Sequence, residues 1–559
     1  MQQELTCNQK HRPWHEPLAY LAILVLTLPF VYALSKNGFD SHHTGLMYKG
    51  ALDVANGKIL FSETFTQYGA LTTYIQALFL LLFGKRVTSI LLATALFYAL
   101  DYLLLYRISR RFLSRTLSLA GTVITVFLAP FYFENWFFHP WSSVFAITFL
   151  LLSLDFLLLA FEKGKRSSFL FAALSGACAS LSFWCRQPVG MVTVLAGILC
   201  IAFLALCQRK ARRSLFVLLG VFLAGVAVGI LLLLIPIAAM GATKDFVRQS
   251  LGGMFTFASD RSTAENAGLW GLCSHLFYSL FTSPFYNAYH IWIDPVWTLL
   301  PLAALVMALG VAVRMILAAR KTGELAPRDV LLLVYGVFAV ANWHQYYPVP
   351  CYRHWYWGGF LCVPIVLLFL QWGIAKLSAR QRLAFLKKPR VTPLVLALAT
   401  LLLFGGNVGF RAVHAVKSAA SMRENGVFEH PQYEHLNGLY LNDTMREHYT
   451  LLLDAVALLE KNFPDTNIIN TTGNGIYAVF GENFCPMFNN SGDYFYEEYP
   501  TWLADYIAAE QPIVIGPEAP AGYVLYLEIP GDGGDEFAAS HNMPANIYLP
   551  AALYEALVS

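Results

Sequence analysis

The sequence predicts an all-α polytopic membrane bundle of about eleven transmembrane helices, followed by a small α/β domain. First, its 559 residues are 57% hydrophobic and only 13% charged, whereas soluble domains carry about 25% charged residues. Second, apolar runs long enough to cross a bilayer recur up to residue 408. Third, residues 413–559 contain 20 acidic and 4 basic residues. We therefore divide the chain into a transmembrane domain, residues 1–412, and an acidic domain, residues 413–559.

The first predicted span is the apolar run at residues 17–34. Eighteen helical residues extend roughly 27 Å, which is just enough for the hydrocarbon core. The run has the length of a signal peptide, but no small-x-small cleavage site follows it, so we expect it to be retained. Lys10 and Arg12 precede it and place the N-terminus in the cytoplasm.

Charge decides how the next apolar segment, residues 68–83, is placed. If this segment lies at the membrane surface, the second span is residues 87–106 and the following basic cluster faces the cytoplasm. That cluster consists of Arg107, Arg110, Arg111 and Arg115. If the segment crossed, every later basic cluster would face outward instead. We therefore predict a juxtamembrane helix at residues 68–83.

The remaining spans follow from the same rule. We predict them at residues 117–133, 142–161, 168–184, 191–207, 215–240, 296–318, 330–342, 355–374 and 392–408. Every basic cluster between them then lies in the cytoplasm. The prediction is a multi-pass protein of the cell membrane, with the N-terminus inside and the C-terminus outside.

The acidic domain alternates helical and strand-like runs. Its predicted helices are residues 445–461 and 501–509, and its predicted strands are residues 467–470, 512–515 and 523–528. Long acidic domains cross membranes regardless of their charge, so we expect this domain outside the cytoplasm. The glycine-rich segment at residues 471–475 matches no phosphate-binding loop and is interpreted as a turn. The nine cysteines form no C-x-x-C pair, which argues against a zinc site or a disulfide framework.

Given this topology, polar side chains collect in the outer connections. They are Asp40, His42, His43, Gln67, Tyr68, Glu134, Asn135, His139, Arg186, Gln187, His344, Gln345, Arg353 and His354. Asp40, His42 and His43 share one short loop after the first span. Such groups in a largely lipid-facing chain point to the handling of something polar. The alternative is a loop that is polar only because water solvates it.

Arg186 and Arg353 matter most among these residues, because an arginine just outside a span on the outer side opposes the usual charge bias. A guanidinium group binds phosphate through a planar fork of donors. Two such groups near Asp40 suggest a lipid phosphate held beside a general base. Alternatively, each arginine reaches toward lipid headgroups or pairs with a neighbouring acid.

These residues carry a resemblance to a known superfamily. The pattern includes Phe-Asp-Ser-His-His-Thr-Gly at residues 39–45, a glycine-bounded segment at residues 50–57 and Phe-Thr-Gln-Tyr-Gly at residues 65–69. It continues at residues 105–111 and returns as Tyr-Arg-His-Trp at residues 352–355. It resembles the GT-C membrane glycosyltransferases, closest to the bacterial branch related to protein O-mannosyltransferases and the lipid A aminoarabinose transferase. The acidic domain resembles their variable outer domain.

The resemblance implies transfer of a sugar from a polyprenyl-phosphate carrier to an extracytoplasmic glycan, lipid or protein, with inversion in a single displacement. Asp40 matches the presumed general base, and Glu134 matches a second acid that positions the acceptor or a metal. Arg186 and Arg353 match phosphate contacts. The remaining expected substrate-binding residues are His42, His43, Gln67, Tyr68, Gln187 and His354. No nucleic-acid partner is expected.

One departure from the family pattern leaves the metal requirement open. Many relatives have Asp-Glu in the first outer loop, whereas this chain has Asp-Ser-His-His. A divalent ion, Mg or Mn, with Asp40 and Glu134 as ligands stays one alternative. In the other, His42 and His43 take over metal or phosphate binding.

Two other functions are compatible with the composition. A transporter or flippase of a lipid-linked saccharide would place ionisable groups within the membrane. Asp101 and Asp155 are the acids inside predicted spans, but they form no paired pattern. A non-catalytic receptor would account for the acidic domain and leave the Asp40 loop unexplained.

Overall fold

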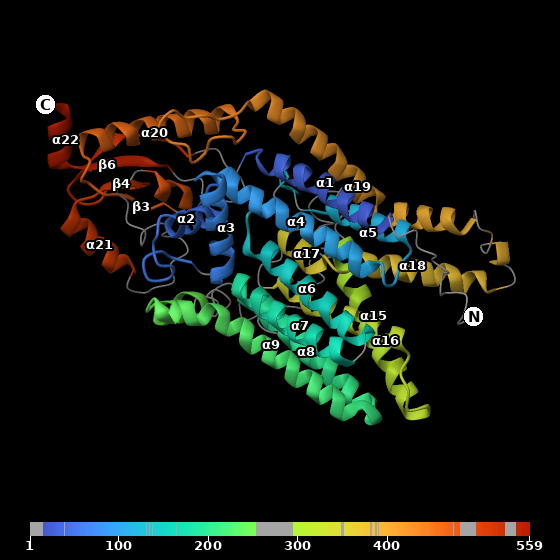
Figure 1. The fold of residues 1–559 in the computed structure, drawn as a ribbon. Coiled ribbons are helices and arrows are strands. Elements are labelled where there is room, and N and C mark those ends of the chain that lie inside the picture. The colour runs from blue at the N-terminus through green and yellow to red at the C-terminus, as the bar shows by residue number, and fades with distance from the viewer. Residues whose placement is uncertain are drawn as a thin grey trace.

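The computed structural model describes most residues of the chain. They are residues 15–38, 40–66, 68–129, 131–132, 135–136, 138–163, 165–252, 295–347, 352–380, 383–385, 388, 391–472, 474–480, 499–531 and 544–559. The fold is a helical bundle with a small sheet near its C-terminus (Figure 1), as the sequence predicts.

Each of the eleven predicted spans corresponds to a helix, or in one case to a bent pair. The helices are α1 (His15–Ser35), α4 (Val87–Ser109), α5 (Arg115–Phe127), α6 (Ser142–Glu162), α7 (Lys165–Cys185), α8 (Gln187–Cys207), α9 (Arg212–Ala239), α15 (Pro295–Lys321), α16 (Pro327–Asn342), α17 (Tyr352–Gly359), α18 (Val363–Ser378) and α19 (Val391–Asn425). Within the described residues, eight helices are long and apolar enough to cross a membrane. The pair α17 and α18, bent by 53°, makes a ninth. Helices α5 and α16 are shorter, with 13 and 16 residues.

Close packing of α7 against α9 depends on glycine. A Cβ atom built on Gly225 would lie 2.0 Å from the carbonyl oxygen of Ala173, and one on Gly176 would lie 2.0 Å from that of Phe222. Small residues of this kind let membrane helices approach at backbone distance. The outer face of α9 exposes Val228, Leu232 and Ile235, as a lipid-facing helix would.

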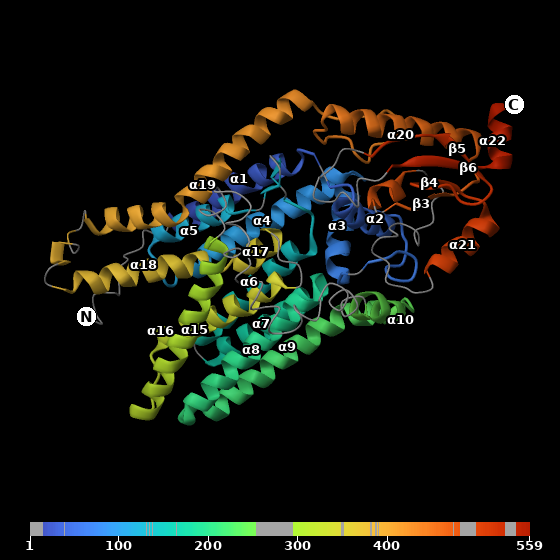
Figure 2. The ribbon, with the colours of Figure 1, turned by 180° about the vertical axis from the view of Figure 1, so that it is seen from behind.

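Two short helices, α2 (His43–Ala55) and α3 (Ala70–Phe83), form one end of the bundle. The 14 residues of α3 extend about 21 Å, less than the hydrocarbon core, as expected for a juxtamembrane helix. Figures 1 and 2 place α2, α3 and the C-terminal sheet at this end. The α8–α9 and α15–α16 turns lie at the opposite end. Which end faces the cytoplasm stays a prediction from charge.

The C-terminal sheet has the strand order β3-β4-β6-β5. Its strands are β3 (Ile468–Asn470), β4 (Ile513–Gly516), β5 (Tyr523–Leu527) and β6 (Asn546–Pro550). Strands β3 and β4 are parallel, and β6 is antiparallel to both β4 and β5. Helices α20 (Asp443–Asn462), α21 (Tyr499–Glu510) and α22 (Ala551–Val558) accompany the sheet, with a 3-10 turn, η5 (Gly475–Val479), after β3.

Helix α19 runs without a break through residue 412, the predicted domain boundary. The helix therefore connects the bundle directly to the C-terminal part of the chain. The division at residues 412 and 413 stays a prediction.

Candidate functional site

Asp40 lies in the connection between α1 and the first turn of α2. Its carboxylate Oδ1 accepts the backbone N–H of His43 at 2.8 Å, and its carbonyl oxygen accepts the N–H of Thr44 at 2.9 Å. The N-terminus of a helix carries unpaired N–H groups and a partial positive charge, and both favour an anion there. Only 9% of Asp40 is exposed. The chain therefore buries this carboxylate at a place that stabilises its charge.

Histidine rings surround the Asp40 carboxylate. Nδ1 of His43 lies 2.5 Å from Oδ2 of Asp40, and the His42 ring packs edge-on against the His43 ring at 4.5 Å between centroids. Burial by itself raises the pKa of Asp40, but His43, and then His139 and His42, hold that pKa well below its usual range. Asp40 is therefore ionised at neutral pH.

Arg353, at the start of α17, connects to this cluster through His139. Its Nη1 lies 3.2 Å from Nε2 of His139, and the His139 ring lies 6.1 Å from the His43 ring. A guanidinium group can only donate, so Nε2 of His139 accepts and the ring proton is assigned to Nδ1. Burial, and then the charge of Arg353, keep the pKa of His139 well below its usual range. His139 therefore lies between the Arg353 guanidinium and the ring of His43, the partner of Asp40.

Arg186, between α7 and α8, reaches the same cluster by way of aromatic rings. Its Nη1 donates to Oγ of Ser143 at 2.5 Å, and its guanidinium carbon lies 5.8 Å from the centre of the Tyr68 ring. The Tyr68 ring packs against Trp141 at 5.1 Å, and Trp141 packs against His43 at 4.8 Å. Two aromatic side chains therefore lie between Arg186 and the Asp40–His43 pair.

Gln187 supports the backbone of this region. Its amide hydrogen-bonds Oγ of Ser250, which in turn donates to the carbonyl oxygen of Tyr68 at 2.8 Å. Next to it, the side chain of Gln249 donates to the carbonyl oxygen of Phe61 at 2.6 Å. A single π-helical turn, η2 (Val247–Gly252), thus holds the segment that presents Tyr68.

The structure gathers most of the predicted residues at one end of the bundle. Asp40, His42 and His43 share one contact network with His139 and Arg353, and Tyr68 and Trp141 link it to Arg186. His354 packs against Trp357, with 5.6 Å between the ring centroids. Gln67 and Glu134 lie outside the described residues.

Sequence reasoning left four residues of this cluster without a role. His139 and Trp141 flank Pro140 at the start of α6, and a histidine in an outer connection is a usable signal for the first. Ser143 is the second residue of α6, and Ser250 lies within η2. Nothing in their local sequence distinguishes them from other serines of the chain, so no pattern indicates their pairing with Arg186 and Gln187.

No group of three His, Cys, Asp or Glu side chains in the described part of the chain is arranged to hold a metal ion. Each oxygen of Asp40 is bonded to a donor of His43, and the Arg353 cation faces His139. Glu134, the second candidate ligand, lies outside the described residues. The metal alternative stays a prediction.

The chain resembles known proteins in part of its sequence and in its fold. The family model described as dolichyl-phosphate-mannose-protein mannosyltransferase matches residues 69–237. The apo structure of ArnT from Cupriavidus metallidurans is similar over 96% of this chain and 98% of its own, with 13% identity and a TM-score of 0.52. AglB, the oligosaccharyltransferase of Archaeoglobus fulgidus, is similar over 90% of this chain and 70% of its own, with 13% identity and a TM-score of 0.50. No curated protein sequence matches the chain. The chain has the fold of the GT-C membrane glycosyltransferases, and the resemblance seen in its sequence is confirmed at that level.

Proposed function

We propose that the chain is a membrane glycosyltransferase that moves a sugar from a polyprenyl-phosphate carrier to an acceptor outside the cytoplasm. The observation that carries the proposal is the buried, ionised Asp40, joined through His43 and His139 to the Arg353 guanidinium. An acid and a cation held at one end of a membrane bundle suit a reaction between a hydroxyl group and a phosphate ester. The AglB structure contains a dolichol-phosphate, which supports a polyprenyl-phosphate carrier here.

In the proposed reaction Asp40 is the general base. An ionised carboxylate has about four lone-pair positions, and His43 takes only two of them. The proton of the acceptor hydroxyl passes to Asp40 while the hydroxyl oxygen bonds to the anomeric carbon. The bond from that carbon to the carrier phosphate breaks, and the configuration inverts. General-base assistance of this kind is worth about 10²–10⁴ in rate.

Arg353 and Arg186 are proposed to bind the carrier phosphate. Negative charge grows on this phosphate as it leaves, and preorganised guanidinium donors stabilise that charge in a site shielded from water. Tyr68 supports Arg186, because the face of an aromatic ring attracts a cation. Gln187 acts on the site indirectly, through Ser250 and the Tyr68 backbone.

The acids inside the bundle give the transporter alternative less support than the Asp40 cluster gives sugar transfer. Asp155 is paired with Arg107 at 3.1 Å and Arg111 at 2.8 Å, in the second half of α6, whereas the start of α6 adjoins the Asp40 cluster through Trp141. Asp101 accepts a hydrogen bond from Thr148. Neither acid contacts the Asp40 cluster through a described hydrogen bond. The described residues therefore show no chain of polar contacts from these acids to Asp40.

The test is a donor panel. Purified protein in lipid nanodiscs is incubated with undecaprenyl-phosphate-linked sugars and a mixture of candidate acceptors, and release of undecaprenyl phosphate is measured. We expect release with at least one donor, and its loss in Asp40→Asn. NMR of the product should show inversion at the anomeric carbon. Movement of an intact donor across the bilayer without carrier release would favour the flippase and reject sugar transfer.

A further inference from the structure

We infer that the C-terminal domain positions the Asp40 loop, defined here as residues 36–48, through backbone contacts on both sides of Asp40. This inference deepens the proposed function and rests on it, because it assigns the domain a part in holding the general base. The contacts come from three separate segments of the domain, so one local irregularity does not account for them.

The first contact lies just before Asp40. The N–H of Gly38 donates to the carbonyl oxygen of Tyr440 at 2.7 Å, and the N–H of Tyr440 donates to that of Lys36 at 2.8 Å. Between them, the side chain of Asn37 donates to Oγ of Ser418 in α19 at 2.8 Å. Three consecutive residues of the loop are therefore tied to the C-terminal part of the chain.

The second contact lies just after Asp40, where η5 packs against α2. The N–H of Ile476 donates to the carbonyl oxygen of Ser41 at 3.1 Å. The two backbones cross at glycines: a Cβ on Gly45 would lie 2.1 Å from N of Ile476, and one on Gly475 would lie 2.6 Å from N of Leu46. No real Cβ contact is that short, so this approach requires glycine at both positions.

The turn that delivers η5 to this contact is internally braced. The side chain of Asn470 donates to the carbonyl oxygen of Asn474 at 2.8 Å and accepts the N–H of Thr472 at 2.9 Å. Oγ1 of Thr472 accepts the N–H of Asn474 at 3.0 Å. All three side chains are buried. The glycine-rich segment after β3 therefore fixes η5 relative to the sheet, which transmits the position of the sheet to α2.

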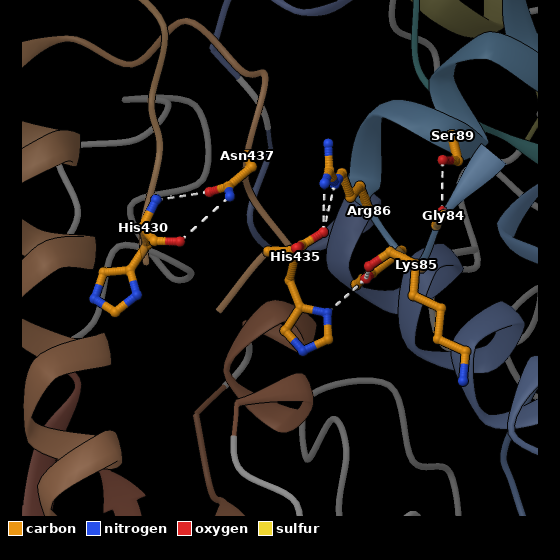
Figure 3. Close-up of polar contacts among 9 residues, drawn as sticks. Gly84, Lys85, Arg86, Ser89, His430, His435 and Asn437 are labelled. Atoms are coloured by element: carbon orange, nitrogen blue, oxygen red, sulfur yellow. Dashed lines mark hydrogen bonds and ion pairs between the residues drawn. The ribbon is translucent and has the colours of Figure 1, made fainter. Parts of the chain in front are cut away.

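The third contact joins residues 430–437 to the corner between α3 and α4, where Figure 3 shows His435 beside Lys85 and Arg86. The carbonyl oxygen of His435 accepts the N–H of Val87 at 2.8 Å. Nδ1 of His435 lies 2.7 Å from the hydroxyl oxygen of Tyr48, which belongs to α2. Figure 3 also shows the two hydrogen bonds between His430 and Asn437 that shape this segment. The far end of the Asp40 loop is thereby anchored too.

The test compares two glycine variants of the full-length protein in nanodiscs. Gly475→Ala places a methyl group against α2. Gly225→Ala is the matched control, because its Cβ would lie 2.0 Å from the carbonyl oxygen of Ala173, between α9 and α7 and away from the loop and the C-terminal domain. Hydrogen–deuterium exchange reports on the loop without any substrate. We expect the amides of residues 41–48 to exchange about tenfold faster in Gly475→Ala, with the sheet amides unchanged. In Gly225→Ala the loop should exchange as in the wild type.

The rate of carrier release and its pH dependence provide a second measurement, which a purely structural role of the contact would leave unchanged. In Gly475→Ala we expect the rate of carrier release to fall about tenfold or more at saturating donor, with donor binding little changed. The acid limb of its pH–rate profile should move to higher pH, because Asp40 loses its fixed place among the histidines. Ser418→Ala removes an acceptor of Asn37 without crowding any neighbour. We expect it to speed the exchange of the loop amides and to slow carrier release, both by less than Gly475→Ala. This variant keeps the test decisive if Gly475→Ala does not fold.

Loop exchange at the wild-type rate in both Gly475→Ala and Ser418→Ala would overturn the inference, as would equal loop exchange in Gly475→Ala and Gly225→Ala. A different result would disprove the proposed sugar transfer and leave this inference intact. In that case no donor releases undecaprenyl phosphate in the wild type, while the difference in loop exchange persists.

Discussion

His43 holds the carboxylate of Asp40 twice, through its backbone N–H at 2.8 Å from Oδ1 and through ring Nδ1 at 2.5 Å from Oδ2. One residue therefore fixes both the rotation of the carboxylate and its charge. A base fixed in this way needs no reorganisation when the acceptor arrives, which is how positioned groups lower a barrier.

Asp40→Asn should lower the rate of carrier release by about 10²–10⁴ with little change in melting temperature. The amide keeps the shape of the side chain and an oxygen that accepts the His43 N–H, but it cannot take a proton from the acceptor. Asp443→Asn, at the exposed start of α20, is the control and should retain wild-type activity. Equal rates in Asp40→Asn and the wild type would remove Asp40 from the chemistry.

His43→Ala should move the acid limb of the pH–rate profile to higher pH. The pKa of Asp40 is raised by burial and lowered mainly by His43, so removing the ring leaves the effect of burial less opposed. Because this pKa is depressed in the folded protein, the ionised form contributes stability above the unfolded pKa, and that stability is lost as the pH falls through the folded pKa. The variant should therefore also lose stability at a higher pH than the wild type.

His42→Ala is the matched control for this shift. His42 has the smallest effect of the three histidines that lower the pKa of Asp40, so its removal should move the acid limb less than that of His43. The pH–rate profiles and melting curves of both variants measure these two shifts. An equal shift in the two would contradict the assignment of His43 as the main partner.

Much of the bundle could be predicted from the sequence, because basic residues mark one side of a membrane and apolar length marks each crossing. The distribution of basic residues predicted that residues 68–83 do not cross the membrane, and α3 in this segment has only 14 residues. The bend between α17 and α18 was not predicted, because Pro364 lies within the first turn of α18, where it is tolerated. Strand β6 was also missed, since Asn546–Pro550 offers only three consecutive apolar residues before a proline.

The site was only partly predictable for a different reason. The sequence identifies Asp40 and Arg353 as unusual residues, but 214 positions separate Arg353 from His139, and no local pattern encodes such a pairing. The crossing of Gly45 and Gly475 is equally remote. Sequence patterns indicate which groups are out of place in a membrane protein, whereas the packing of distant connections decides which of them meet.

Arg353→Ala should raise the KM for the carrier-linked sugar about 10- to 100-fold, the range expected for loss of a charged hydrogen bond. Arg353→Lys should recover part of this loss, because a lysine keeps the charge without the planar fork. Arg314→Ala is the control, since Arg314 forms an exposed pair with Asp329 that contributes little. An unchanged KM in Arg353→Ala would exclude this residue from donor binding.

Tyr68→Phe and Tyr68→Leu together test the support of Arg186. Phenylalanine keeps the ring face beneath the guanidinium group, whereas leucine removes it. An interaction of about 0.5–1 kcal/mol predicts a loss of roughly two- to fivefold in donor affinity for Tyr68→Leu and little loss for Tyr68→Phe. Isothermal titration with an undecaprenyl-phosphate sugar measures both. A large loss of donor affinity in Tyr68→Phe would instead show that the hydroxyl group of Tyr68, and not its ring face, contributes to donor binding.

Asp155→Ala separates the enzyme from the transporter. This carboxylate is buried beside Arg107 and Arg111, and removing one partner of a buried ion pair costs about 3–5 kcal/mol. We expect a clear drop in melting temperature, because both arginines lose a partner. Well below that temperature, the rate of carrier release per folded molecule should remain near the wild-type value, since Asp155 lies in the second half of α6, whereas the start of α6 adjoins the Asp40 cluster through Trp141. A loss of activity in the folded protein, with intact donor no longer crossing the bilayer, would instead place Asp155 on a transport path.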